Sequence, residues 1–107
     1  MDQKDTNRLI LQFEHLLRQV NRERINPVID DLSIDDLIPI IDLVARCRAS
    51  YLKHLYDLSK KYHQTDQFPT SEELKKLKAY RNRYIEVADG SKSVEASIQR
   101  GYLNLKS

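Results

Sequence analysis

The chain has 107 residues, of which 40% are hydrophobic and 32% charged, with only 2 Gly, 3 Pro and a net charge of +2. This composition excludes collagen-like, linker-like and fully disordered classes, because enough apolar surface is present to offset the entropy lost on ordering. No apolar run approaches the roughly 20 residues that a membrane-spanning helix needs. The first residues lack the basic and apolar regions of a secretory signal. We expect one helical domain over residues 1–107, cytoplasmic and without membrane contact.

Charge is unevenly distributed between the two halves of the chain. Residues 1–50 carry 7 Lys and Arg against 9 Asp and Glu, whereas residues 51–107 carry 11 against 7. The net charge of the whole chain is too small to identify a partner by itself. The acidic first half and the basic second half therefore either attract each other or form two surfaces of opposite charge.

The first predicted element is a helix whose apolar residues follow the i, i+3/i+4, i+7 spacing of one helical face. Asp5 or Thr6 is the expected N-cap, since a short oxygen-bearing side chain accepts hydrogen bonds from the first turn. The helix is expected to end near residues 21–24. A break should follow at Asn26 and Pro27, because proline disfavours the α conformation of the preceding residue. The apolar face contains Leu9, Ile10, Phe13, Leu16, Leu17 and Val20.

A long second helix is predicted over residues 34–62. Ser33 and Asp36 form the pattern of a capping box, with Asp in the place of the usual Glu. Pro39 predicts either a kink or a helix start near residue 38, because it removes one backbone donor. One apolar row contains Leu37, Ile41, Val44, Tyr51, Leu55, Leu58 and Tyr62, and a second contains Ile40, Ala45, Cys47, Leu52 and Tyr56. Together the rows cover an arc of about 180°, wider than a simple surface helix needs, so neighbours are expected on two sides.

The next segment is predicted to form a loop over residues 63–69 and then a third helix. Thr70 and Glu73 form another capping box, and Phe68 is placed to pack on Leu74 in a hydrophobic staple. The apolar side of this helix contains Leu74, Leu77, Tyr80, Tyr84, Ile85, Val87 and Ala88.

A short fourth helix is predicted near the C-terminus. Gly90 is expected to end the third helix, because glycine adopts the left-handed C-cap conformation at little cost. Ser91 or Ser93 is then the expected N-cap, and the apolar tail over residues 101–105 must either dock or fray. The predicted fold class is all-α, a small helical bundle of three main helices plus a short C-terminal helix.

Arg48 lies within the apolar arc of the second predicted helix. A guanidinium buried without a partner is costly, so it requires a carboxylate or a route to solvent. Simple antiparallel hairpins place Arg48 opposite Asp5 and Glu86, which are the candidate ion-pair partners. The other interpretation places Arg48 at an oligomer interface, where a polar residue in an apolar seam fixes the register.

The wide apolar arc and the tyrosines favour a protein-interaction surface. Tyrosine combines apolar area with a polar tip, which suits partly hydrated interfaces. The candidate interface residues are Arg48, Tyr51, Leu55, Tyr56, Tyr62 and Tyr102. They predict a non-catalytic adaptor or regulator that acts by self-association, as a homodimer, or by binding a partner protein.

The basic second half supports an alternative interpretation as a small nucleic-acid-binding regulator. Its candidate residues, which would neutralise phosphates, are Lys75, Lys76, Lys78, Arg81 and Arg83. Tyr80 and Tyr84 fall on the apolar face of the same helix, whereas most of these cations point away from it. The tyrosines that could stack on bases and most of the cations that could contact phosphates therefore do not line one groove. A steep loss of affinity with salt distinguishes this interpretation from protein binding.

No pattern typical of catalysis, a cofactor or a metal site is present. The three histidines are scattered, and the aspartates near the second helix lack the spacing of a calcium loop. Cys47 lies about 10 Å along the helix from His54, which is too far for a base to activate the thiol. Cys47 is expected in the core. We expect no catalytic residue, no cofactor, no metal and no small-molecule substrate.

Overall fold

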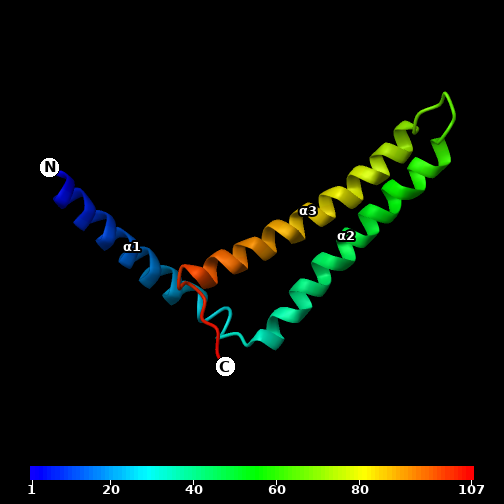
Figure 1. Ribbon diagram of the computed structural model, residues 1–107. Coiled ribbons are helices and arrows are strands. Elements are labelled where there is room, and N and C mark those ends of the chain that lie inside the picture. Colours follow the sequence, from blue (N-terminus) through cyan, green and yellow to red (C-terminus); the bar gives the residue numbers. More distant parts are fainter. The chain divides into compact units, whose positions relative to one another are not determined.

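The computed structural model describes residues 1–107 and contains three helices and no strand (Figure 1). The helices are α1 (Gln3–Ile25), α2 (Ile34–Tyr62) and α3 (Ser71–Gln99). The all-α fold class and the three main helices are confirmed, whereas the predicted fourth helix is wrong, because its residues belong to α3. None of the helices has the length and apolarity that crossing a membrane requires.

The chain divides into two compact units. The terminal unit contains Met1–Leu37 and Ser93–Ser107, and the hairpin unit contains Ile38–Lys92. The terminal unit thus holds α1 and the two chain ends, and the hairpin unit holds most of α2 and α3.

The N-terminus of α1 is capped earlier than predicted, at Asp2 and not at Asp5 or Thr6. Asp2 Oδ1 accepts a hydrogen bond from the backbone N–H of Asp5 at 2.9 Å, so Asp2 is the N-cap. Thr6 instead donates its Oγ1 hydrogen to the carbonyl oxygen of Asp2 at 3.0 Å. The helix ends at Ile25, and a turn follows at the predicted break.

α2 begins with the predicted capping box. Asp36 Oδ2 accepts hydrogen bonds from the backbone N–H of Ser33 at 2.8 Å and from its Oγ at 2.9 Å. These bonds, the backbone one first, hold the pKa of Asp36 below its usual range. The helix continues through Pro39 to Tyr62. The continuous helix over residues 34–62 is therefore confirmed, and a start near residue 38 is wrong.

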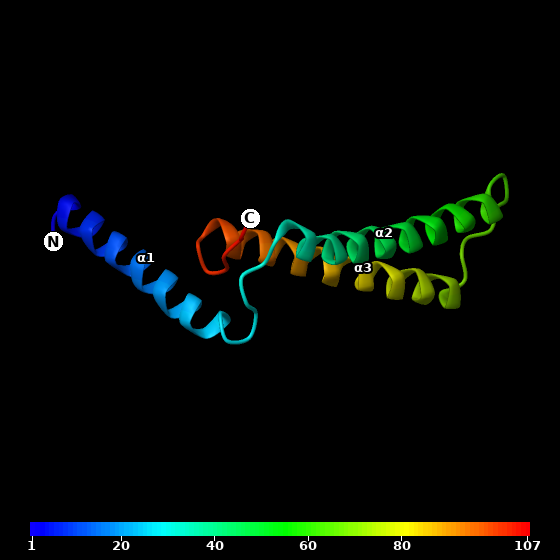
Figure 2. The same cartoon turned by 90° about the horizontal axis from the view of Figure 1, so that it is seen from below.

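α2 and α3 run antiparallel and side by side in the hairpin unit (Figures 1 and 2). The rings of Tyr51 and Tyr84 stack with their centroids 6.1 Å apart. One turn further along, the rings of His54 and Tyr80 lie 4.2 Å apart. Facing side chains recur at steps of 3 and 4 residues, the spacing of a coiled-coil seam. We define the seam as Val44, Cys47, Tyr51, His54, Leu58 and Tyr62 of α2 with Glu73, Leu77, Tyr80, Tyr84, Val87 and Ser91 of α3, all buried or half-buried.

α3 passes through Gly90, where a helix end was predicted. Gly90 has an ordinary negative φ, and the seam continues on both sides of it. Packing along the seam outweighs the penalty of about 1 kcal/mol for a glycine inside a helix. The helix ends instead before Gly101, whose φ is +77°. Tyr102 N donates to Ser97 O at 2.8 Å and Gly101 N donates to Ile98 O at 3.1 Å, which is the Schellman arrangement.

The apolar C-terminal tail docks within the terminal unit. Leu103 is only 6% exposed. Leu32 N donates to Asn104 O at 2.9 Å, and Lys106 N donates to Leu32 O at 2.8 Å. These hydrogen bonds join Leu32 and Leu105 in a parallel bridge. The segments before α2 and after α3 therefore hold each other through the backbone.

Replacing Gly90 with alanine is expected to stabilise the protein by about 1 kcal/mol, since alanine favours the helix and restricts the unfolded chain. A Cβ at this position meets no atom within 4 Å. Urea unfolding followed by circular dichroism measures the change. Gly101→Ala is the matched control and is expected to destabilise, because its φ is +77° and its new Cβ would lie 3.1 Å from the Arg18 side chain. A Gly90→Ala protein no more stable than the original would contradict this account of α3.

Candidate functional site

α2 carries a second row of apolar side chains that α3 does not cover. Each residue of this second row comes directly after a residue that faces α3, so the second row also repeats at steps of 3 and 4. Ile38 is 55% exposed, Ile41 63% and Leu52 52%. We define the exposed row as Ile38, Ile41, Ala45, Arg48, Leu52 and Leu55. The wide arc predicted for this helix therefore divides into two rows, of which only the seam has a partner in the hairpin unit.

The exposed row shares one flank of the hairpin with a row of α3. In each helix, the residues that directly follow a seam residue in the sequence form one row. Because the two helices run in opposite directions, these two rows lie on the same side of the hairpin. The α3 row contains Leu74, Lys78, Arg81, Ile85, Ala88 and Lys92. We call this row and the exposed row together the open flank. Within the hairpin unit its charged side chains, Arg48, Lys78, Arg81 and Lys92, are all cations.

The opposite flank has a different composition. Its charged residues are of both signs, and its one large aliphatic side chain is Leu43. Asp57 of α2 and Lys76 of α3 line a common hollow of about 220 Å³ there, which places both on this side. The apolar row is therefore a property of one flank and not of the hairpin surface in general.

Arg48 connects the exposed row to the seam. Its Nε donates to the hydroxyl oxygen of Tyr84 at 3.3 Å, and its guanidinium carbon lies 5.3 Å from the centre of that ring. This contact is a cation–π interaction with a hydrogen bond at the ring's polar end. The predicted ion pair with Glu86 is wrong, because Glu86 lies on the opposite flank, and Asp5 belongs to α1. The positive charge of Arg48 has no carboxylate partner in the hairpin unit.

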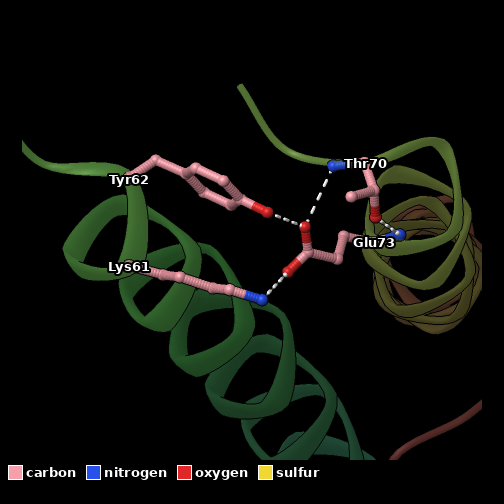
Figure 3. Close-up of polar contacts among 4 residues, drawn as sticks. All are labelled: Lys61, Tyr62, Thr70 and Glu73. Carbon is pink, nitrogen blue, oxygen red and sulfur yellow. Dashed lines mark hydrogen bonds and ion pairs between the residues drawn. The ribbon is translucent and has the colours of Figure 1, made fainter. Parts of the chain in front are cut away.

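Tyr62, a predicted interface residue, is part of a polar clamp at the end of the hairpin where α2 connects to α3 (Figure 3). We define the clamp as Lys61, Tyr62, Thr70 and Glu73. The Tyr62 hydroxyl donates to Glu73 Oε1, and Lys61 Nζ donates to Glu73 Oε2 at 2.8 Å. Thr70 N also donates to Glu73 Oε1 at 2.9 Å, while Glu73 N donates to Thr70 Oγ1 at 3.1 Å. The predicted capping box is thus confirmed. The staple is wrong, since Phe68 is 85% exposed.

The hydrogen bonds of the clamp change the pKa values of its groups. The pKa of Glu73 is lowered from 4.5 to about 2, with the hydrogen bond from Lys61 as the largest cause. The pKa values of Lys61 and Tyr62 are raised, chiefly by their hydrogen bonds to Glu73. Charged Glu73 therefore joins the last turn of α2 to the first turn of α3.

Because the pKa of Glu73 is depressed on folding, its charge stabilises the protein above pH 4.5, and this stabilisation is lost as pH falls towards 2. The Glu73→Gln protein is expected to be less stable at neutral pH. The difference in unfolding free energy between the two proteins should shrink between pH 4.5 and 2. Urea titrations at several pH values measure this difference, and a pH-independent difference would exclude a stabilising role of the charge.

The other predicted interface residues are spread over the molecule. Leu55 belongs to the exposed row and is 45% exposed, whereas Tyr51 is half-buried in the seam. Tyr56 is 57% exposed on the outer face of α2, with Lys60 Nζ 5.4 Å from its ring centre. Tyr102 is half-buried in the terminal unit. Ile41 and Leu52 were placed in the predicted apolar arc but not among the candidate interface residues, and Ile38 was placed in neither, although its spacing matches theirs.

The five cations proposed for nucleic-acid binding lie on three faces of α3. Lys78 and Arg81 are on the open flank, whereas Lys76 and Arg83 are on the opposite flank. Lys75 points outward, 3.8 Å from Glu72. The structure therefore does not gather these residues into one stripe, and nucleic-acid binding stays a prediction.

A further apolar face is exposed on α1, in the terminal unit. No residue of this helix is buried. The six large apolar side chains on one side of the helix range from 36% exposed at Leu17 to 63% exposed at Phe13. We define the α1 face as Leu9, Ile10, Phe13, Leu16, Leu17 and Val20. It contains the residues predicted from periodicity to form one side of the first helix.

Two chemical features complete the description of the site. Cys47 is buried in the seam, as predicted, and is 8% exposed. No group of three or more His, Cys, Asp or Glu side chains is arranged to hold a metal ion.

Comparison of the chain with known protein families, curated proteins and solved structures finds no match.

Proposed function

We propose that this chain is a non-catalytic interaction protein that binds another protein chain along the exposed row of α2. The observation that carries the proposal is the exposure of Ile38, Ile41, Leu52 and Leu55, at the spacing with which helices pack. An ordered apolar row of this kind is unusual on the surface of a monomer and typical of interaction sites. The cationic positions beside it would select a partner with acidic residues near its own apolar side chains.

The size of the exposed row limits how it acts. Burying a whole aliphatic side chain contributes roughly 1.5–3 kcal/mol, so a half-exposed one has about 1 kcal/mol still to gain. The four large members of the row would contribute about 4 kcal/mol, whereas association costs roughly 4–15 kcal/mol. A stable complex therefore needs contacts beyond the row itself. The interaction protein is expected to bind as part of a larger surface.

The proposal is tested by cross-linking in the cells that make the protein. A photo-reactive benzoylphenylalanine placed at Leu52 is expected to form a covalent adduct with a second protein chain, because this position faces outward from the exposed row. Ser50, which is exposed on the opposite flank of the same helix, is the matched control position. Denaturing gels and mass spectrometry then identify the adducts.

Adducts to a defined protein chain at position 52 and not at position 50 would support the proposal. Equal cross-linking at both positions, or none at position 52, would contradict it. Adducts to nucleic acid would instead favour the alternative function.

A further inference from the structure

We propose that the exposed row is covered by α1 of a second copy of this chain, in a reciprocal dimer. Each α1 would lie along the open flank of the other copy, so that both copies contribute the same two surfaces. The inference rests on the proposed function and names its partner. It is carried by two exposed apolar faces, whose flanking charges have opposite signs.

The α1 face matches the exposed row in kind and length. The residues from Leu9 to Val20 extend about 17 Å along the helix, and those from Ile38 to Leu55 about 26 Å. The shorter face therefore fits within the longer one. All the large side chains of both faces are at least 36% exposed, so each has area left to bury.

Charges on α1 are segregated around its axis. At 100° per residue, Asp5, Glu14 and Glu23 lie within about 105° of the centre of the α1 face. The cations Lys4, Arg8, Arg18 and Arg22 lie more than about 135° from it, on the back of the helix. Arg24, in the last turn, is the exception, because it lies about 25° from the centre of the face, beyond Val20. The α1 face is therefore bordered mainly by carboxylates.

The open flank provides the opposite charges. Its charged side chains in the hairpin unit are Arg48, Lys78, Arg81 and Lys92. None of these four residues takes part in the ion pairs of the structure, which are Lys53–Asp57, Lys61–Glu73 and Lys75–Glu72. An approaching α1 would bring carboxylates to cations and apolar side chains to the exposed row at the same time.

The same charges disfavour the other ways in which two copies could meet. Two open flanks would bring cations against cations, and two α1 faces would bring carboxylates against carboxylates. Only the unlike pairing satisfies both surfaces. If a two-fold axis relates the two copies, the same pairing occurs twice and the assembly closes as a dimer with both exposed rows covered.

The test uses full-length variants and light scattering after size-exclusion chromatography. Variant A carries Glu14→Lys and Glu23→Lys, and variant B carries Lys78→Glu and Arg81→Glu. The original protein is expected to be a dimer, whereas each variant alone should dissociate at least about tenfold more readily, because like charges meet in both interfaces. Arg8→Glu with Arg22→Glu, on the back of α1, is the control and should leave the dimer unchanged.

Mixing variants A and B should restore a dimer. In the mixed dimer the reversed α1 of A meets the reversed flank of B, and the two unchanged surfaces meet each other. A monomeric original protein, variants that stay dimeric, or a mixture that does not recombine would each overturn the inference. If the variants fail to fold, cross-links from position 52 to α1 between isotopically heavy and light copies of the original sequence decide the question.

The two proposals fail in different ways. A cross-link from position 52 to an unrelated protein, with a monomeric original protein, would overturn the reciprocal dimer and leave the proposed function supported. No specific cross-link from that position would overturn both.

Discussion

α2 carries two neighbouring rows of mostly apolar side chains, each repeating at steps of 3 and 4 residues, and α3 covers one of them. A helix that presents apolar side chains over a wide arc needs a neighbour for each part of that arc. The seam uses the first part, through the stacked pairs Tyr51–Tyr84 and His54–Tyr80. The second part stays exposed beside it. The register of the seam therefore decides which residues of α2 are available to another chain.

The seam and the exposed row are connected through Arg48. The ring of Tyr84 stacks on Tyr51 in the seam, and its hydroxyl and face contact the Arg48 side chain. Tyr84 thus orients a charged member of the exposed row while packing inside the hairpin. Glu73 has a comparable role at the end of the hairpin where α2 connects to α3. Its carboxylate accepts hydrogen bonds from Lys61, in the last turn of α2, and from Thr70, directly before α3. Polar groups at the edges of the seam therefore define the geometry of the surface next to it.

Sequence reasoning succeeded where local chemistry decides the structure. The capping boxes at Ser33 and Thr70 depend on side chains three residues apart, and both were predicted. Sequence reasoning failed where packing outweighs local preference. Gly90 favours the end of a helix by its local chemistry, but packing along the seam continues α3 past it. The apolar arc of α2 was visible, but periodicity alone does not say which strip a neighbour covers. The ion pair predicted between Arg48 and Glu86 is therefore absent, and the register brings Arg48 to Tyr84.

The position of Cys47 has a practical consequence. It is the only thiol in the chain and lies buried where the two helices meet. A reagent that modifies thiols reaches it only when α2 and α3 separate, so the rate of labelling reports how often the hairpin opens. Binding of another chain to the outer side of α2 would leave the sulfur untouched and still slow its modification, by making that opening rarer.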